Sequence, residues 1–304
     1  NTIRNFGKIP GIDLMEYTGK DILIKIRKRN FKAVIFMDLG NLHAKDFLFI
    51  PYRVSPFYPS VRSILALPHR RIFFTRKPFT PWGTHMADIC IKTIECLGFK
   101  FKEKRAIFIH SKKDEENVNI FLKKNNINKF IIIHPGGKFV VETLKKGKWP
   151  PHLWPLDRYA NVASHFNKKG YNILITGSKD ESILADEIAK QSSVPIINCC
   201  GKLSIREVGV LLSKTRLLIS TDTSIVHIAY QVETPIVELM GPSYPKVVGA
   251  WPIDSPRHHI LFDTGPCAYT MKKMECPEDI ICLGNITVNE VIKSSEDLLR
   301  KKFK

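Results

Sequence analysis

Polar residues able to bind an anion gather where a short apolar run ends, at residues 220–227. Residues 217–219 predict a buried strand, and the Ser, Thr and Asp residues that follow are typical of helix starts. Free backbone N–H groups at a helix start bind phosphate, and His227 shares a helical face with Thr223, four residues earlier. The segment therefore predicts a turn for an anionic, nucleotide-bearing ligand. Asp222 would orient the N–H donors, or would simply cap the helix. His227 would donate a hydrogen bond to a phosphate oxygen, or would simply pack as a structural residue.

Three further polar turns follow predicted strands, at residues 134–137, 176–178 and 200–201. In a parallel sheet the carboxyl ends of all strands meet at one edge, so we expect the four turns to line one cleft. Gly136 and Gly137 let the backbone approach a ligand closely. Each turn alone is explained as an ordinary βα connection, which favours Gly, Ser and Asp. Four turns at one edge favour a binding site.

The elements that would position these turns alternate along the chain. Predicted strands at 130–133, 172–176, 196–197, 217–219 and 235–240 are separated by predicted helices, among them 156–167, 180–191 and 204–213. Such alternation predicts a parallel sheet with helices on both faces. Earlier residues predict a strand within 31–38 and helices at 85–97 and 115–125. We expect domains at 1–127 and 128–286, and a final helix at 287–304 able to pack back on the first domain.

The composition is basic, with 47 Lys and Arg against 29 Asp and Glu and a formal net charge of +18 over 304 residues. This charge favours nucleic acid, acidic lipid headgroups or a phosphorylated substrate, while a solvated Lys-rich surface explains it equally well. No apolar run approaches the roughly 20 residues of a membrane-spanning helix. The seven cysteines contain no C-x-x-C pair, which predicts a reduced, cytoplasmic protein without a zinc site. Three of them, Cys267, Cys276 and Cys282, fall in one loop.

Residues 222–242 resemble the signature of glycosyltransferase family 9, the ADP-heptose:lipopolysaccharide heptosyltransferases. That signature is D-T-G-x-x-H-x-A, followed by a P-x-[IV] strand and G-P; here it is D-T-S-I-V-H-I-A at 222–229, P-I-V at 235–237 and G-P at 241–242. Residues 133–136, the Trp-Pro pairs at 149–150 and 154–155, and the segments 177–181 and 201–204 also resemble family motifs. The resemblance places Glu181 at the nucleotide ribose and Leu203 near the adenine. The donor-binding residues it implies are Gly136, Lys148, Gly177, Glu181, Leu203, Asp222, Thr223, Ser224 and His227.

The resemblance implies an α/β protein of the GT-B type, in which two Rossmann-like domains with parallel sheets face a cleft. It also implies inverting transfer of a heptose from ADP-heptose to a lipid-linked acceptor of the lipopolysaccharide core type, without a metal or cofactor. The implied partners are an ADP-sugar, that acceptor and an anionic membrane surface, with no nucleic acid. The implied location is cytoplasmic, peripheral to the inner face of the inner membrane.

Three positions depart from the family pattern. Ser224 replaces a glycine, and His152 replaces a lysine two residues before the second Trp-Pro, with Lys148 as the nearest substitute. The strand, glycine-rich turn and Asp base that begin family members are not found before Lys20, so no catalytic residue is assigned. We expect either an active transferase whose first domain is incomplete in this sequence, or a nucleotide-sugar-binding chain impaired in catalysis. A nucleic-acid-binding protein is a third hypothesis, favoured by charge alone.

Overall fold

The computed structural model describes residues 28–35, 47–55, 74–76, 78–81, 83–101, 107–263, 281–301 and 303. The chain divides into two compact units, Asn1–Arg105 and Ala106–Lys304. This division precedes the expected boundary at 127/128, because helix α6 (Lys112–Lys124) packs on α10 (Ile205–Lys214) through Val118. Helix α6 is therefore grouped with the second unit, while the predicted functional domains stay predictions.

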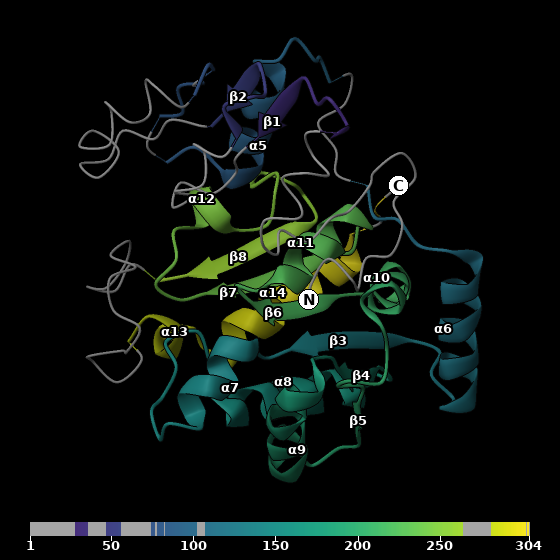
Figure 1. Cartoon of the computed structure of the whole chain (residues 1–304). Helices are drawn as coiled ribbons and strands as arrows, with labels where there is room; N and C mark the ends of the chain where they lie inside the picture. Colours follow the sequence, from purple (N-terminus) through teal and green to yellow (C-terminus); the bar gives the residue numbers. More distant parts are fainter. Residues whose placement is uncertain are drawn as a thin grey trace. The chain divides into compact units, whose positions relative to one another are not determined.

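The second unit is built on a six-stranded sheet in which every pair of neighbours is parallel (Figure 1). The strand order is β5-β4-β3-β6-β7-β8, which is the doubly wound Rossmann order. The predicted parallel sheet is thus confirmed. Its strands are β3 (Phe130–His134), β4 (Asn172–Ile175), β5 (Ile196–Asn198), β6 (Leu218–Thr221), β7 (Ile236–Met240) and β8 (His258–Phe262).

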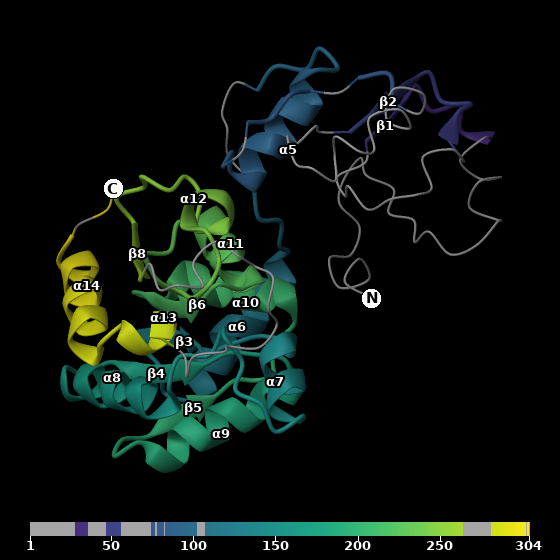
Figure 2. The same cartoon turned by 90° about the vertical axis from the view of Figure 1, so that its left-hand side faces the viewer.

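Helices cover both faces of this sheet (Figure 2). Alternate residues of each central strand point to opposite faces, as the strand geometry requires: Ile131 and Ile133 enter one apolar cluster, Phe130 and Ile132 the other. Each buried side chain of this size contributes about 1.5–3 kcal/mol. Helices α8, α9 and α14 pack in the first cluster, and α6, α10 and α11 in the second. The remaining bounds are α7 (Lys138–Leu144), α8 (Leu156–Lys168), the 3₁₀ turn η2 (Lys179–Glu181), α9 (Ser182–Gln191), α11 (Ser224–Gln231), α12 (Pro245–Val248), α13 (Ile281–Asn285) and α14 (Val288–Arg300).

Hydrogen bonds at helix ends fix where the loops begin. The Ser204 hydroxyl accepts the N–H of Glu207, and the Glu207 carboxylate accepts the N–H of Ser204, which is the capping box expected at the start of α10. The indole N–H of the buried Trp154 donates to the carbonyl of Ile286 at 2.9 Å, so the Trp-Pro entry of α8 is fastened to the start of the C-terminal segment. These bonds fix the starts of α8 and α10.

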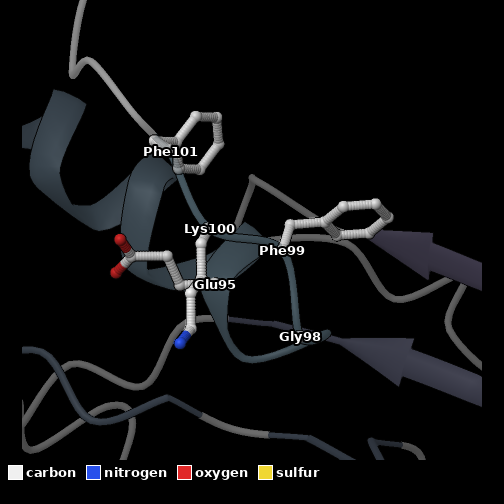
Figure 3. A pocket seen from close by; sticks show the side chains of 5 residues that line it. All are labelled: Glu95, Gly98, Phe99, Lys100 and Phe101. Carbon is white, nitrogen blue, oxygen red and sulfur yellow. The ribbon is translucent and has the colours of Figure 1, made fainter.

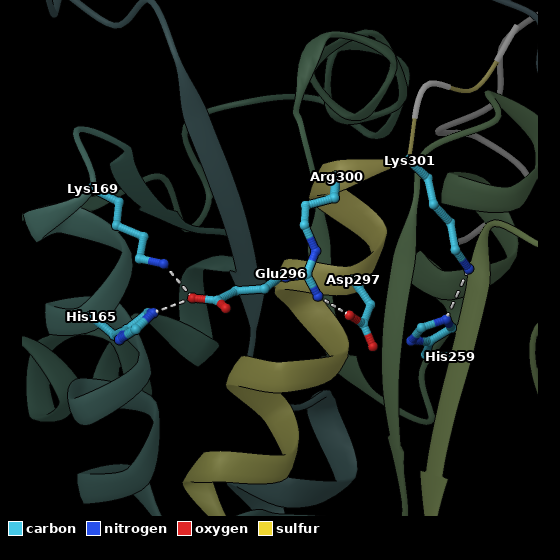
Figure 4. Close-up of polar contacts among 7 residues, drawn as sticks. All are labelled: His165, Lys169, His259, Glu296, Asp297, Arg300 and Lys301. Atoms are coloured by element: carbon cyan, nitrogen blue, oxygen red, sulfur yellow. Dashed lines mark hydrogen bonds and ion pairs between the residues drawn. The ribbon is translucent and has the colours of Figure 1, made fainter.

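Helix α14 packs within the second unit, against α8, β7 and β8. Glu296 accepts hydrogen bonds from His165 of α8, at 2.9 Å, and from Lys169, the residue that caps the end of α8 (Figure 4). These contacts explain how the C-terminal helix is held. Packing of this helix against the first domain stays a prediction.

The described part of the first unit contains two parallel strands, β1 (Ala33–Ile35) and β2 (Tyr52–Val54), and helix α5 (Met86–Glu95). A single parallel bridge joins Val54 to Arg76. The C-cap of α5 is Cys96, not Gly98 as expected; Gly98, two residues further, has a φ of +95°, a conformation that glycine adopts without strain. The strand predicted within 31–38 is confirmed at β1, and residues 36–38 lie outside the described residues.

Among the described helices, none combines the length and apolar character needed to cross a membrane. Cys282 is buried in α13, whereas Cys267 and Cys276 of the predicted cysteine loop lie outside the described residues.

Candidate functional site

Contacts link the four predicted turns into one continuous surface, here called the rim and defined as residues 134–137, 176–178, 200–201 and 221–224. The Thr221 hydroxyl donates to the carbonyl of Pro135 at 3.3 Å, joining the turns after β6 and β3. His134 Nδ1 lies 3.1 Å from Thr176 Oγ1, joining β3 to β4. The N–H of Gly201 donates to the carbonyl of Gly177 at 2.9 Å, joining the turns after β5 and β4. The prediction that these turns share one edge is confirmed.

The centre of the rim lies where β3 and β6 pair side by side. In this strand order the connections leave β3 and β6 toward opposite ends of the sheet, and ligands of open α/β sheets bind at that point. Gly137 faces Thr223 there: a Cβ added to Gly137 would lie 3.8 Å from Thr223 Cγ2, an ordinary contact distance. The two turns therefore approach closely, and a larger side chain at Gly137 would extend over the turn after β6.

Helix α11 starts at this point without a side-chain cap. Its N-cap residue is Thr223, whose side chain makes no capping hydrogen bond and instead lies 3.2 Å from the Ser220 hydroxyl. The first N–H groups of a helix need acceptors, and an anion satisfies them. Asp222 is not the N-cap. Ser224 is the first helical residue, in a backbone conformation that serine adopts without strain.

Glu181 already has a structural contact. This buried carboxylate accepts the N–H of Ser178 at 2.8 Å and closes a capping box around η2. A Cβ on Gly177 would come within 2.8 Å of the same oxygen and 3.0 Å of Cys200 Sγ, so this turn requires glycine. Gly136 is constrained in the same way, since its Cβ would lie 2.9 Å from Val140. These residues shape the rim; the expected contact of Glu181 with a ribose stays a prediction.

The other predicted residues lie in or beside the rim. Asp222 and Thr223 are half-buried, whereas Ser224 and His227, one turn along α11, are exposed. Lys148 is exposed on the loop after α7, and Leu203 is half-buried before α10, packed on the second apolar cluster. The structure thus brings together most of the predicted set and leaves Lys148 and Leu203 on flanking loops.

His152 is a further basic residue near the rim, noted in the sequence only as a departure from the family lysine. Its half-buried ring lies edge-on to Phe139, with centroids 6.0 Å apart. Its loop is packed on the end of β7, because a Cβ on Gly241 would approach the Pro151 carbonyl oxygen to 2.8 Å. Burial lowers the pKa of His152, and the nearby Asp222 carboxylate partly offsets that effect. His152 is therefore able to gain a proton when an anion binds.

A buried carboxylate lies one strand away. Glu238 of β7 pairs in register with Ser220 of β6 and is 1% exposed. Its Oε2 accepts the N–H of Ala250 at 2.8 Å, while its Oε1 has no hydrogen-bond partner among the described residues. Burial raises the pKa of Glu238 to about 8, with a further contribution from Asp222. Glu238 is thus mostly neutral at pH 7. The signal in the sequence was a single carboxylate within an apolar strand.

Neither His134 nor any group of possible metal ligands among the described residues forms a second site. Burial lowers the pKa of His134 to about 4, so its imidazole is neutral in the rim. Within the described ranges, no three His, Cys, Asp or Glu side chains are grouped as ligands of a metal ion would be. The expected absence of a metal in the reaction stays a prediction.

The first unit has a hollow of its own, of about 440 Å³, at the end of α5. It is lined by Glu95, Gly98, Phe99, Lys100 and Phe101 (Figure 3). Phe99 and Phe101 are 62% and 40% exposed. Exposed aromatic rings beside a lysine are typical of a surface that contacts another apolar and anionic body.

Comparison with known proteins gives a consistent result. Residues 95–280 match the family model described as glycosyltransferase family 9 (heptosyltransferase). The chain is 24% identical over 242 residues to lipopolysaccharide heptosyltransferase 3 of Escherichia coli (strain K12), covering 76% of the chain and 65% of that protein. It is 32% identical over 103 residues to lipooligosaccharide heptosyltransferase 2 of Haemophilus ducreyi, covering 32% of the chain and 30% of that protein. The chain thus spans less than two thirds of the length of these curated relatives.

Solved structures share the fold. A family 9 glycosyl transferase from Veillonella parvula DSM 2008 matches 92% of the chain and 77% of its own, with a TM-score of 0.73 and 22% identity. The structure of E. coli heptosyltransferase WaaC with ADP matches 91% of the chain and 77% of its own length, with a TM-score of 0.60 and 16% identity. The predicted fold class, α/β of the GT-B type, is confirmed; the expected cleft between domains stays a prediction. Because the family model matches more than half of this chain, the chain belongs to glycosyltransferase family 9, the heptosyltransferase family.

Proposed function

We propose that this protein is an inverting glycosyltransferase that moves a heptose from ADP-heptose to a lipid-linked acceptor of the lipopolysaccharide core type. The observation that carries the proposal is the approach of Gly137 to Thr223 beside the uncapped start of α11. A diphosphate at the β3–β6 crossover would accept hydrogen bonds from the first N–H groups of α11, which no side chain caps. The match to heptosyltransferases, one of them solved with ADP, supports the choice of donor.

The proposed reaction exchanges one bond for another at the anomeric carbon. The acceptor oxygen attacks that carbon, the bond to the diphosphate oxygen breaks, and its electron pair leaves with the diphosphate. A general base takes the acceptor proton, and no described residue is assigned to that role. Negative charge develops on the leaving diphosphate, where the N–H groups of α11 and the side chains of His227 and His152 would stabilise it. The proposed step uses no metal or cofactor.

A nucleotide-sugar-binding chain impaired in catalysis remains the alternative, because the rim supplies donor contacts and no base. The two hypotheses agree on binding and differ on turnover. A nucleic-acid-binding function is supported by net charge alone.

The experiment combines binding and turnover. Because a charge-assisted hydrogen bond contributes about 1.5–3 kcal/mol, His227→Ala should weaken ADP binding about tenfold to a hundredfold without changing the thermal midpoint. Calorimetry measures the affinity. Release of ADP from a panel of ADP-sugars, with a lipid-linked core saccharide present, measures transfer. Binding without release in the complete protein would favour the impaired chain, and no ADP binding would contradict both readings.

The proposal includes peripheral attachment to an anionic membrane surface on the cytoplasmic side of the inner membrane. The exposed rings of Phe99 and Phe101 beside Lys100 support it, because aromatic side chains enter the headgroup layer while lysine contacts anionic lipid. The net charge of +18 favours the same partner.

A further inference from the structure

A second concave surface lies at the opposite edge of the sheet in the second unit, where β6 and β7 begin and α14 ends. This basal groove has a volume of about 410 Å³ and is lined by Arg216, Pro235, Leu299, Arg300, Lys301 and Phe303, among others. The rim lies at the carboxyl edge of the same strands. The basal groove is therefore separate from the proposed donor site.

The wall of the basal groove is apolar and held in place. Pro235, Leu299 and Phe303 supply its carbon surface. The guanidinium of Arg257 lies over the Phe303 ring, 4.6 Å from its centroid, and Arg257 is also 3.9 Å from Glu233. The Phe303 ring is thus fixed by a stacked cation. A flat or aliphatic group would find a preformed surface there.

Three cations surround this wall, and no Asp or Glu is among the described residues that line it. Arg216 is exposed, and its guanidinium has no partner among the residues that the structure describes. Arg300 pairs with Asp297 on its own helix. Arg216 is therefore the cation with its full set of side-chain donors available.

The third cation, Lys301, is held by neutral acceptors. Its ammonium lies 3.3 Å from His259 Nε2 (Figure 4). It also lies 3.5 Å from the carbonyl oxygen of Pro256. Burial and the Lys301 charge lower the pKa of His259, with Asp297 partly opposing them, and this favours a neutral ring that accepts a hydrogen bond from the ammonium. Lys301 thus keeps its positive charge uncompensated by those contacts.

We propose that the basal groove binds a phosphate ester carried on an apolar body. Arg216 would hold the phosphate through two parallel N–H bonds, the geometry that guanidinium and phosphate share, with Lys301 adding a point charge. The apolar body would lie along Pro235, Leu299 and Phe303. An anionic phospholipid and a soluble aryl phosphate both have this chemistry, and inorganic phosphate has only half of it. The proposal is independent of the donor site.

The test uses the full chain with ADP present throughout, so that a phosphate ester does not report on the rim. Phenyl phosphate, inorganic phosphate and vesicles of phosphatidylglycerol or phosphatidylcholine serve as probes. We expect phenyl phosphate to bind more tightly than inorganic phosphate, and Arg216→Glu to weaken it about tenfold or more. Lys113→Glu, an equal charge change on exposed α6, is the control and should bind as the parent does.

The vesicle arm identifies the source of the phosphate. Loss of phosphatidylglycerol binding in Arg216→Glu, but not in Lys113→Glu, assigns the basal groove to a lipid headgroup. Loss confined to phenyl phosphate assigns it to a soluble ester. If Arg216→Glu does not fold, Arg216→Gln takes its place in both arms. Parent-like binding of both probes by the Arg216 variant overturns the proposal, as does equal weakening by Lys113→Glu.

Discussion

The Asp222 carboxylate affects the pKa values of two nearby side chains, one basic and one acidic. Burial lowers the pKa of His152, and Asp222 partly offsets this by favouring the imidazolium; burial raises the pKa of Glu238, and Asp222 adds to this by favouring the neutral acid. Both effects reduce negative charge beside the start of α11. A diphosphate binding there would meet a basic side chain and a protonated carboxyl group, with Asp222 as the remaining nearby anion of the three.

We predict that His152 makes ADP binding depend on pH. Burial keeps the pKa of free His152 below its ordinary value near 6.5, and a bound anion would raise it. Affinity should therefore increase as pH falls through the bound-state pKa, and level off below the free-state pKa. His152→Lys, charged throughout this range, should bind ADP with little pH dependence. Calorimetry between about pH 5.5 and 8.5, in buffers of different ionisation enthalpy, measures both affinity and proton uptake.

Other charged groups set the controls for that experiment. Lys138 and Glu142 on α7 are 3.5 Å apart and offset each other, Lys148 lies on the same loop as His152, and Asp222 and Glu238 lie on the rim side. These groups are unchanged in His152→Lys. Equal pH slopes in the parent and the variant would rule out His152 as the source. Loss of ADP binding in both would instead count against the donor site itself.

The residue types of the rim were predictable from sequence, but their contacts were not. Gly136 and Gly177 were found in turns after strands and Glu181 from the family resemblance, yet the structure shows Glu181 bonded to the turn and both glycines required by packing. His152 was noted only because it stands where the family has a lysine; the influence of Asp222, which is distant in sequence, is seen only in the fold. A sequence gives the donors and acceptors; only the fold shows which are already paired.

Among the elements, strand β7 is joined to the loop between α12 and β8 by a buried hydrogen bond. Glu238 Oε2 accepts the N–H of Ala250, and Trp251, next in sequence, lies edge-on to Tyr230 of α11 with centroids 5.6 Å apart. The loop between α12 and β8 is thus connected to both the sheet and the helix of the rim. A substitution of Glu238 that removes the hydrogen bond to Ala250 should therefore alter the position of this loop.

We predict that Glu238 lowers stability as pH rises. The pKa of Glu238 is about 8 in the folded protein and near its ordinary value in the unfolded chain. Its contribution to the free energy of unfolding is therefore fully present at pH values below the unfolded pKa, and it is lost as the pH rises from that value to about 8. The free energy of unfolding should fall by about 1.4 kcal/mol per pH unit from this group within that window. Glu238→Gln cannot ionise. Urea unfolding of both proteins at several pH values should give a difference that grows with pH; a constant difference would contradict the assignment.

Most elements of the second unit were predictable; α7, β8 and the short helices α12 and α13 were missed, and the first two have clear physical reasons. The apolar runs at β3, β6 and β7, and the capping box at α10, match the structure closely. Helix α7 was missed because it follows two glycines and contains adjacent β-branched valines, which disfavour a helix locally. Strand β8 was missed because it begins with His258 and His259 and is only partly buried. Tertiary pairing with β7 determines it.

For the whole second unit, the alternation of elements predicts parallel pairing but not strand order. The crossovers after β3 and β4 build the sheet outward in one direction, and the chain then returns to place β6 beside β3. Right-handed crossovers put helices on opposite faces of the two halves. This return creates the crossover point at which turns from distant parts of the sequence meet. It also places the basal groove at the other edge, so that the two proposed anion-binding regions lie at opposite ends of the same strands.

The central claim is that the Gly137–Thr223 approach holds the diphosphate of an ADP-sugar. Gly137 has a φ of −121°, an extended conformation open to any residue, so Gly137→Leu should fold while its side chain fills the space over the turn after β6. Ala189→Leu, on the exposed face of α9, is the matched control.

Calorimetric titration of ADP into the parent and these two variants tests the claim most directly. We predict binding by the parent and by Ala189→Leu, and an affinity at least about tenfold lower, a loss of about 1.4 kcal/mol or more, in Gly137→Leu. Parent-like ADP binding by a folded Gly137→Leu variant, or no ADP binding by the parent, would contradict it.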